Sequence, residues 1–298
     1  MKIVRFWSRK RLHLGILEED YVVDLTSLDE RVFRSFRSLA LYAESNGKAI
    51  HEVIEKALMT CNSRLIRLRV GQNTPIKLAI PVSPPEVWCC GVTYKRSQEA
   101  REAETLIKGI YDIVYNAARP EIFFKGTRRH CVGPEDAIGI RGDSSWSVPE
   151  PELAFVLGHR GKIIGFTGGN DVSSRDIEGE NPLYLTQAKT YKGSCAIGPA
   201  IVTVDQIGLE PRLQIECEVF RNGKSLFKGS TNTAMMKRRI DELRSYLLRF
   251  NPVPFSSVCL TGTGIVPPDD FSLEDKDIVE VRVEQIGVLR NRVRRLVI

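Results

Sequence analysis

Two glutamates separated by one residue have the types and spacing that best fit metal-ion chemistry in this sequence. Glu150 and Glu152 precede an apolar run, Leu153–Leu157. In an extended segment residues i and i+2 share a face, so both carboxylates point the same way with Cα atoms roughly 6.6 Å apart. Such a pair repels unless a positive group lies between them, and hard divalent cations prefer carboxylate oxygens. A solvated, acidic start of a strand is the commoner origin of this spacing.

Three more charged positions could belong to the same site. Asp171 lies in a turn-rich stretch and could complete a three-carboxylate site, although Asn-Asp after Gly-Gly is also ordinary turn chemistry. Glu121 and Lys125 bracket a short apolar strand and share one face of it if the strand is regular. These two residues could face a site, or they could form a plain surface salt bridge.

The composition indicates an ordinary globular protein. The chain has 298 residues, of which 42% are hydrophobic and 27% charged, with a formal net charge of +6. Basic and acidic residues alternate, which argues against a nucleic-acid-binding stripe and favours attraction of a small anionic substrate. No apolar stretch is long enough to span a membrane, and the N-terminus lacks the apolar core of a signal peptide. We therefore expect a cytoplasmic protein without a membrane or nucleic-acid partner.

The cysteines and histidines indicate no metal site of their own. The seven cysteines are scattered without CxxC spacing, and several lie in apolar, strand-like runs. The four histidines lack metal-ligand spacing as well, which argues against zinc. We expect the cysteines to be reduced residues of the core.

The elements that must position these residues predict an α+β protein in two parts. A small N-terminal α+β domain, residues 1–80, combines a three-stranded meander with two helices and two further strands, and its predicted role is structural or in oligomerisation. The linker candidate is Pro81–Pro85. The helices are expected at 29–46 and 48–61, and the later strands at 65–70 and 76–79.

Residues 85–298 predict a β-rich catalytic domain with few helices. Pro149 and Pro151 remove two backbone donors, so that end of the strand is expected at a sheet edge or bulge. Asn222-Gly223 between alternating strands is a strong hairpin signal. The other expected elements are a buried strand at 87–92, a charged and solvated helix at 98–115, a hairpin of strands 153–157 and 162–166, and a helix at 235–250.

Six short motifs then occur in one order and at characteristic spacing over roughly residues 85–298. They are Gly91-Val92-Thr93-Tyr94, Phe124-Lys125-Gly126, Pro149–Ala154, Gly169–Ser173, Lys189 with Ile197-Gly198-Pro199, and Thr261–Gly264. On these motifs the chain resembles the fumarylacetoacetate hydrolase superfamily. The resemblance implies a mixed β-roll C-terminal domain, a homo-oligomer (dimer or tetramer), and Mg²⁺ held by Glu150, Glu152 and Asp171, with Ca²⁺ or Mn²⁺ as possible substitutes.

One motif departs from the pattern of the hydrolytic members. Their Tyr-x-x-His element ends here at Ser97, and Ala100 stands where an acidic residue usually follows. That histidine and a glutamate are expected to activate water for C–C cleavage, so this chain is not expected to hydrolyse its substrate in that way. The variant motif and the segment Arg119–Lys125 are similar to the members that dehydrate 2-keto-3-deoxy-D-arabinonate to 2,5-dioxopentanoate.

The chemistry of a 2-keto acid chelated by a metal ion predicts roles for the remaining candidates. A metal ion that polarises the keto oxygen of a 2-keto acid acidifies the C3 protons. Lys189 is the predicted base, because burial near a cation disfavours a charged lysine; alternatively, it only neutralises the carboxylates. Glu121 is the predicted acid for the departing C4 hydroxyl. The predicted substrate-binding residues are Arg96, Lys125 and Thr263.

Two other classes of function stay open at this point. One is a C–C bond hydrolase or a decarboxylase of a 2,4-dioxo or 2-keto acid on the same scaffold, which its products would distinguish. The second is a binding or assembly protein that keeps the fold without chemistry. The presence of all three candidate ligands and of Lys189 argues against the second class.

Overall fold

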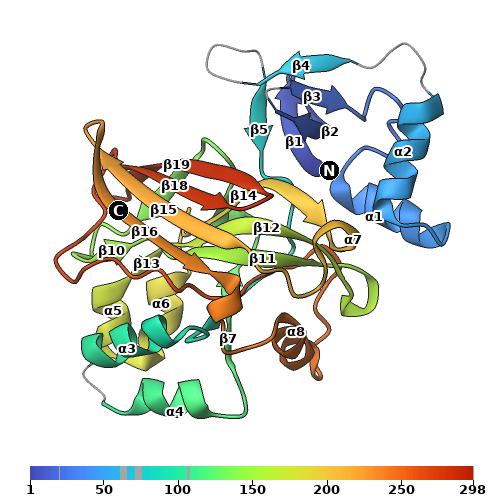
Figure 1. The fold of residues 1–298 in the computed structure, drawn as a ribbon. Helices are drawn as coiled ribbons and strands as arrows, with labels where there is room; N and C mark the ends of the chain where they lie inside the picture. Colours follow the sequence, from blue (N-terminus) through green and yellow to red (C-terminus); the bar gives the residue numbers. More distant parts are fainter. Residues whose placement is uncertain (20, 61–65, 71–75, 106–107, 298) are drawn as a thin grey trace.

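The structure is a computed structural model that describes residues 1–19, 21–60, 66–70, 76–105 and 108–297. Within these ranges two large β-sheets are packed together, and short helices lie below them and beside the N-terminal strands (Figure 1). This architecture confirms the predicted α+β class. Of the helices described, none combines the length and the apolar character needed to cross a membrane.

The larger sheet contains twelve of the described strands and runs through both parts of the chain. Its order is β4-β3-β2-β1-β14-β12-β11-β17-β6-β7, with β5 beside β1 and β8 beside β14. Ile3 of β1 pairs with Ile201 of β14, so the N-terminal segment and the rest share one sheet. The bounds are β1 Lys2–Ser8, β2 Arg11–Glu18, β3 Tyr21–Asp24, β4 Arg67–Arg69, β5 Lys77–Ala79, β6 Val87–Gly91, β7 Glu121–Gly126, β8 Cys131–Val132, β11 Pro151–Leu157, β12 Ile163–Asp171, β14 Cys195–Thr203 and β17 Val258–Leu260.

A second sheet, in the order β16-β15-β18-β19-β9, packs against one face of the first. The predicted turn at Asn222-Gly223 joins β15 and β16, and the positive φ angles of both residues, 52° and 77°, match the twist of a tight hairpin. The bounds are β9 Ala137–Ile140, β15 Gln214–Arg221, β16 Lys224–Asn232, β18 Ile278–Val283 and β19 Gly287–Arg295; a separate pair is formed by β10 Ser147–Val148 and β13 Ser173–Ser174.

Strand β11 is central, which corrects the expected position at a sheet edge. It lies between β12 and β17, and its two faces contribute to two different cores, Phe155 to one and Val156 to the other. Its pairing with β12 begins at Pro151, whereas its pairing with β17 covers only Ala154–Val156. The first residues of β11 therefore extend past the end of β17. Pro151 lies in this part, where β17 does not need a backbone N–H from it.

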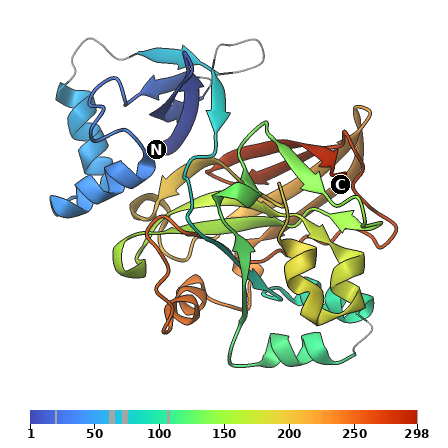
Figure 2. The same ribbon diagram turned by 180° about the vertical axis from the view of Figure 1, so that it is seen from behind.

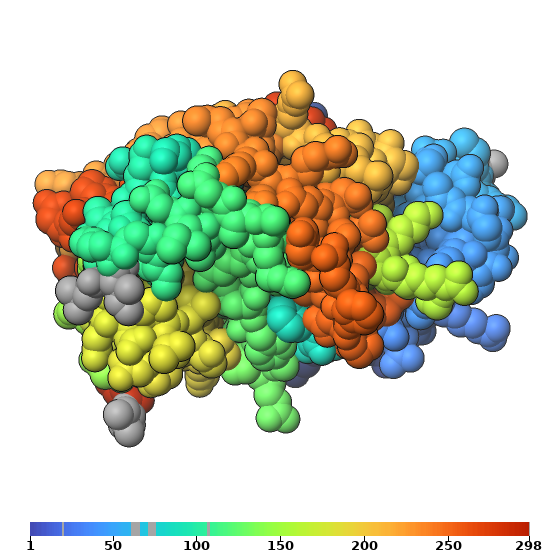
Figure 3. Space-filling view, turned by 90° about the horizontal axis from the view of Figure 1, so that it is seen from below, coloured from blue at the N-terminus to red at the C-terminus, as the bar shows by residue number. Residues whose placement is uncertain are grey.

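Four helices gather below the ends of β11 and β12, as Figures 1 and 2 show from opposite sides. These are α3 Lys95–Glu104, α4 Ile110–Asn116, α5 Arg175–Glu180 and α6 Leu185–Lys189. Seen from below, the α3–α4 and α5–α6 segments lie side by side over one part of this face, and the orange segment that includes α8 lies beside them (Figure 3). The remaining α-helices are α1 Phe36–Ser45, α2 Ile50–Thr60, α7 Val204–Ile207 and α8 Ile240–Leu248.

Several predicted helices are shorter in the structure. The helix expected from residue 29 begins at Phe36, because the Ser35 side chain accepts the Ser38 N–H and caps it. The helix expected at 235–250 covers Ile240–Leu248. The prediction of one solvated helix at 98–115 is wrong: α3 ends at Glu104 and buries Arg101 on its inner face. Part of the expected strand 65–70, and Cys61 at the end of the second expected helix, lie outside the described residues.

Candidate active site

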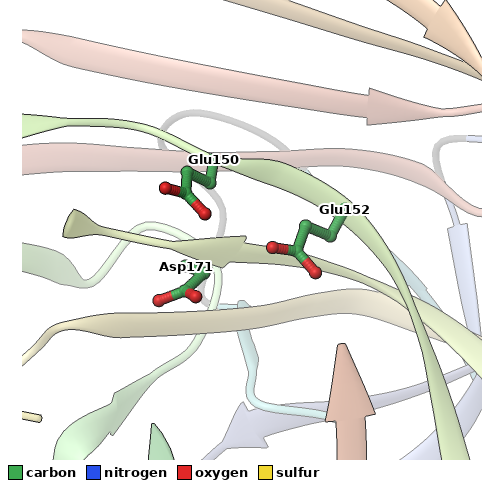
Figure 4. Close-up of side chains that lie close together, drawn as sticks. All are labelled: Glu150, Glu152 and Asp171. Carbon is green, nitrogen blue, oxygen red and sulfur yellow. The ribbon is translucent and has the colours of Figure 1, made fainter. Parts of the chain in front are cut away.

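The hairpin of β11 and β12 brings the three candidate metal ligands together. Glu152 pairs with Gly169 across the hairpin, and the Asp171 N–H donates to the Glu150 carbonyl oxygen at 2.9 Å. Each of the three side chains offers one carboxylate oxygen, and these oxygens lie within 4.8 Å of one another. All three side chains are buried, and their carboxylates point toward a common space (Figure 4). The hairpin register thus creates a concentrated negative site.

The charges around this space fit a divalent cation. Burial, and after it repulsion from Asp171 and Glu150, raises the pKa of Glu152 well above its ordinary value. Burial also raises the pKa of Glu150, although Lys189 and Arg101 oppose the rise. With every carboxyl group ionised, the six carboxylates clustered among the described residues exceed the four cations by the charge of one divalent ion: Glu104, Glu121, Glu150, Glu152, Asp171 and Glu178 against Arg101, Lys125, Arg175 and Lys189.

A turn at Gly262 holds the carboxylate of Glu152. The Gly262 N–H donates to Glu152 Oε2 at 2.5 Å. Gly262 has a φ of +94°, and a Cβ atom there would lie 2.0 Å from Thr93 Oγ1, so no larger residue fits. The backbone N–H of this turn therefore serves a protein carboxylate. Thr263 lines the cavity, but its hydroxyl exchanges hydrogen bonds with the backbone of Ile265.

Two lysines, Lys125 and Lys189, contact the carboxylates. Lys189 Nζ lies 2.9 Å from Glu150 Oε1, 2.6 Å from Ser173 Oγ and 3.4 Å from Asp171 Oδ2. Lys125 Nζ lies 2.5 Å from Asp171 Oδ1 and donates to the Lys189 carbonyl oxygen. Of these two lysines only Lys189 lines the cavity.

The structure places two of the predicted substrate-binding residues outside the cavity lining. Lys125 is fully buried against Asp171, at an irregularity in the pairing of β6 with β7. Arg96 is exposed on the first turn of α3 and lies outside the cavity lining, whereas Arg101 is part of that lining.

The charge state of Lys189 differs from the expected one when no cation is bound. Burial alone would lower the pKa of this lysine, but Asp171, Glu150 and Glu178 outweigh burial and raise it well above its ordinary value. The ammonium form is therefore favoured in the metal-free protein. A divalent cation among the same carboxylates would oppose their effect and make the neutral amine more accessible.

Glu121 lies in the wall of the cavity with a carboxyl group suited to proton transfer. Burial, followed by repulsion from Glu178, raises its pKa to about 7. Glu121 and Lys189 line the same cavity, whose volume of about 20 Å³ is room for little more than a water-sized group. The site thus combines a carboxylate cluster, a lysine and a carboxyl that changes protonation near neutral pH.

Gly91 makes room for this carboxyl, so Gly91→Ala is expected to impair catalysis with little effect on stability. A Cβ atom at position 91 would lie 2.2 Å from Glu121 Oε2, and the carboxyl must move away. A displacement near 1 Å costs about 100-fold in turnover. Steady-state kinetics of Gly91→Ala, Glu121→Gln and the double variant test this. If Gly91→Ala impaired the Glu121→Gln enzyme as strongly as the wild type, the effect would not act through Glu121.

Sequence reasoning missed a group of buried residues around Glu150, among them Arg101. Arg101 lies one helical turn after Ser97 on α3, and both line the cavity. The spacing of four residues between these positions could have indicated that they share one helix face, if a helix beginning directly after Tyr94 had been assumed. Arg175 and Glu178 of α5 follow the Asp171 motif closely, but only the fold places them against α3.

The sequence profile of the Fumarylacetoacetate (FAA) hydrolase C-terminal family matches residues 86–294, which include every element of the site. The chain belongs to this family. Ser97, which the sequence comparison with the hydrolytic members singled out, lies buried in the cavity lining. The described cavity lining accordingly contains no histidine.

Two relatives match about half of the aligned residues over about three quarters of the chain. A 2-dehydro-3-deoxy-D-arabinonate dehydratase of Saccharolobus solfataricus is 48% identical over 76% of this chain and 78% of its own length. A probable 2-keto-3-deoxyxylonate dehydratase of Haloferax volcanii is 50% identical over 72% and 74%. The solved structure of a 2-keto-3-deoxy-D-arabinonate dehydratase with magnesium and 2,5-dioxopentanoate matches with a TM-score of 0.80 and 39% identity, over 99% of both chains.

Proposed function

We propose that this chain is a Mg²⁺-dependent hydro-lyase that converts 2-keto-3-deoxy-D-arabinonate to 2,5-dioxopentanoate in pentose catabolism. The observation that carries this proposal is the carboxylate cluster of Glu150, Glu152 and Asp171 beside a cavity that Glu150 and Asp171 line together with Lys189, Glu121 and Ser97. The similarity to two dehydratases over about three quarters of the chain supports the same reaction.

The three carboxylates would hold the metal ion. When bound, Mg²⁺ supplies a Lewis acid that polarises the substrate's keto oxygen and acidifies the C3 protons. Lys189, in its neutral form, removes a C3 proton, and Glu121, in its acid form, donates a proton to the departing C4 hydroxyl. The unsaturated keto acid that results loses a C5 proton and its C5 hydroxyl proton and takes up one proton each at C3 and C4, which gives the C5 aldehyde.

The protonation states also favour a second assignment of roles. Without a cation Lys189 is held as an ammonium group, whereas Glu121 with a pKa of about 7 is half ionised at neutral pH. In that state Glu121 is the better base and Lys189 the better acid. Exchange of C3 deuterium into solvent distinguishes the two: Glu121→Gln keeps the exchange if Lys189 is the base and loses it if Glu121 is.

Glu121 as the acid predicts a pH dependence of turnover. Because burial and Glu178 raise the pKa of Glu121 to about 7, the proton that it donates is present below pH 7 and lost above it. We expect kcat to fall by about tenfold per pH unit on the alkaline side. Glu121→Gln should lower the plateau and remove this limb from the profile, which kcat measurements from pH 5.5 to 9 can show. An unchanged alkaline limb in the variant would assign it to another group.

The substrate requires more room than the described cavity has. A five-carbon acid exceeds a volume of about 20 Å³, so we infer that lining residues shift when the substrate binds, with those of α3 and α4 as candidates. Ser97 of α3 and Tyr111 of α4 are among the lining residues. They are the residues that such a shift would move relative to the metal site.

Product analysis separates this proposal from the alternatives on the same scaffold. Purified protein with Mg²⁺ and 2-keto-3-deoxy-D-arabinonate should form one equivalent of 2,5-dioxopentanoate, detected by a semialdehyde reagent. Release of CO₂ would indicate a decarboxylase, and a shorter acid fragment would indicate a C–C hydrolase. Ser97→His should not by itself create hydrolysis, because the acidic partner is also absent at Ala100.

The proposal extends to the organisation of the protein. Residues 1–80 form the smaller domain and residues 85–298 the catalytic domain of a homo-oligomer, a dimer or a tetramer.

Six described cysteines are buried free thiols, which fits the proposed cytoplasmic location: Cys89, Cys90, Cys131, Cys195, Cys217 and Cys259.

A further inference from the structure

One oxygen of Glu150 receives all the contacts of this carboxylate with its cationic neighbours. Glu150 Oε1 lies 2.9 Å from Lys189 Nζ and 3.0 Å from Arg175 Nη2. The same atom lies 3.1 Å from Arg101 Nη2 and accepts a hydrogen bond from Ser173 Oγ at 2.9 Å. A further cation at Oε1 would be repelled by three positive groups. Oε2 is therefore the atom that Glu150 can offer to a metal ion.

Both arginines are fixed in turn by Glu104, the last residue of α3. Glu104 Oε2 accepts from Arg101 Nη1 at 2.6 Å and from Arg175 Nη1 at 2.7 Å. Each arginine thus spans two carboxylates, with one nitrogen on Glu104 and the other on Glu150. The Glu104 side chain is only 5% exposed and Arg175 is fully buried, so water does not compete for these contacts.

Glu104 itself has no access to the reacting groups. Neither Glu104 nor Arg175 is among the described residues that line the cavity, and Glu104 contacts the metal ligand only through the two arginines. Removing its charge would leave one terminal nitrogen of each arginine without its carboxylate. Those nitrogens would turn toward the nearest remaining acceptors, which are Glu150 and Glu178.

We propose that Glu104 is a positioning residue that acts through Arg101 and Arg175 to keep one oxygen of Glu150 free for the metal ion. The proposal rests on the proposed function only in requiring that this site binds Mg²⁺. A merely structural role, in which Glu104 joins α3 to α5, would change the stability of the fold without changing the metal affinity of the folded protein.

Direct titration of Mg²⁺ into the full-length protein tests this inference without relying on turnover. Isothermal titration at pH 8, above the pKa of about 7 that burial gives Glu104, compares the wild type with Glu104→Gln and Glu104→Asp. Glu99→Gln is the matched control, because Glu99 is an exposed residue of the same helix. Circular dichroism establishes that each variant is folded.

We expect Glu104→Gln to weaken Mg²⁺ binding by about tenfold, the usual effect of losing a residue that orients a ligand. Glu104→Asp keeps the charge but is too short to reach both arginines, and it should weaken binding by at least about threefold. Glu99→Gln should bind as the wild type does. Excess Mg²⁺ should restore most of the lost turnover in both Glu104 variants.

Three results would overturn the inference. Wild-type affinity in folded Glu104→Gln would show that Glu104 has no part in metal binding. Weak binding in Glu104→Gln together with wild-type binding in Glu104→Asp would mean that charge alone matters. If Glu104→Gln does not fold, Glu104→Asp decides by itself. A wild type that binds no Mg²⁺ would remove the proposed function as well, so the two failures are distinguishable.

Discussion

Glu152→Gln is expected to abolish turnover and, at the same time, to make the metal-free protein more stable. Burial and the neighbouring carboxylates raise the pKa of Glu152 well above its ordinary value, so its ionised form opposes folding at neutral pH. Glutamine has the same shape, removes the charge and can still accept the Gly262 N–H. We expect a gain of about 1–2 kcal/mol in the free energy of unfolding.

The loss of activity in this variant follows from the loss of a metal ligand. Metal stabilisation of developing charge contributes several kcal/mol, so turnover should fall by about 10³-fold or more. Thermal unfolding in EDTA and kinetics in saturating Mg²⁺ measure the two effects separately. The sign of the pH dependence follows as well: the metal-free wild type loses stability as rising pH ionises Glu152, and Glu152→Gln lacks this loss. A variant that keeps Mg²⁺-dependent turnover would remove Glu152 from the metal site.

Replacement of Lys189 is expected to produce the second large effect. General bases contribute about 10²–10⁴-fold to turnover, and both Lys189→Met and Lys189→Arg remove an amine that can become neutral near working pH. Lys189→Arg keeps the positive charge beside Glu150 and Asp171, so it separates proton transfer from neutralisation of these carboxylates.

The decisive readout for Lys189 is exchange of deuterium from C3 of the substrate into solvent. If Lys189 is the base, both variants lose this exchange, whereas Lys189→Arg still binds the substrate. Near-normal turnover in Lys189→Arg would mean that the lysine only supplies charge. Exchange that persists in Lys189→Met would assign the base to another group, with Glu121 as the first candidate because its pKa is about 7.

The sequence predicted the parts of this site that lie close together along one hairpin. Glu150 and Glu152 could be grouped because residues i and i+2 of a strand share one face, and Asp171 follows in the turn-rich segment after the next strand. The order of the six motifs supported this grouping. The structure adds the hairpin register, which places the Asp171 N–H on the Glu150 carbonyl oxygen. Local periodicity was sufficient for these residues because the contacts between them are made within one supersecondary unit.

Contacts between distant segments were beyond the same reasoning. The charged pattern of α3 is typical of a solvated helix, yet Arg101 and Glu104 are buried against α5, about 70 residues later. Arg96 and Arg101 belong to the same helix, and their distances from the site depend on which face α3 turns inward. The burial of Lys125 against Asp171 likewise depends on a contact between β7 and a distant segment, at an irregularity in the pairing of β6 with β7. Packing between elements, and not propensity, decides these positions.

The most direct test is an NMR analysis of the product formed from 2-keto-3-deoxy-D-arabinonate in D₂O. With Mg²⁺ we expect 2,5-dioxopentanoate that carries solvent deuterium at C3 and C4 and none at C5, because a C3 proton is removed first and the later enol regains protons at C3 and C4. Product incubated without protein corrects for spontaneous exchange. With EDTA no product should form, and added Mg²⁺ should restore it. Turnover that is insensitive to EDTA, or products with a shortened carbon chain, would contradict metal-assisted dehydration at Glu150, Glu152 and Asp171.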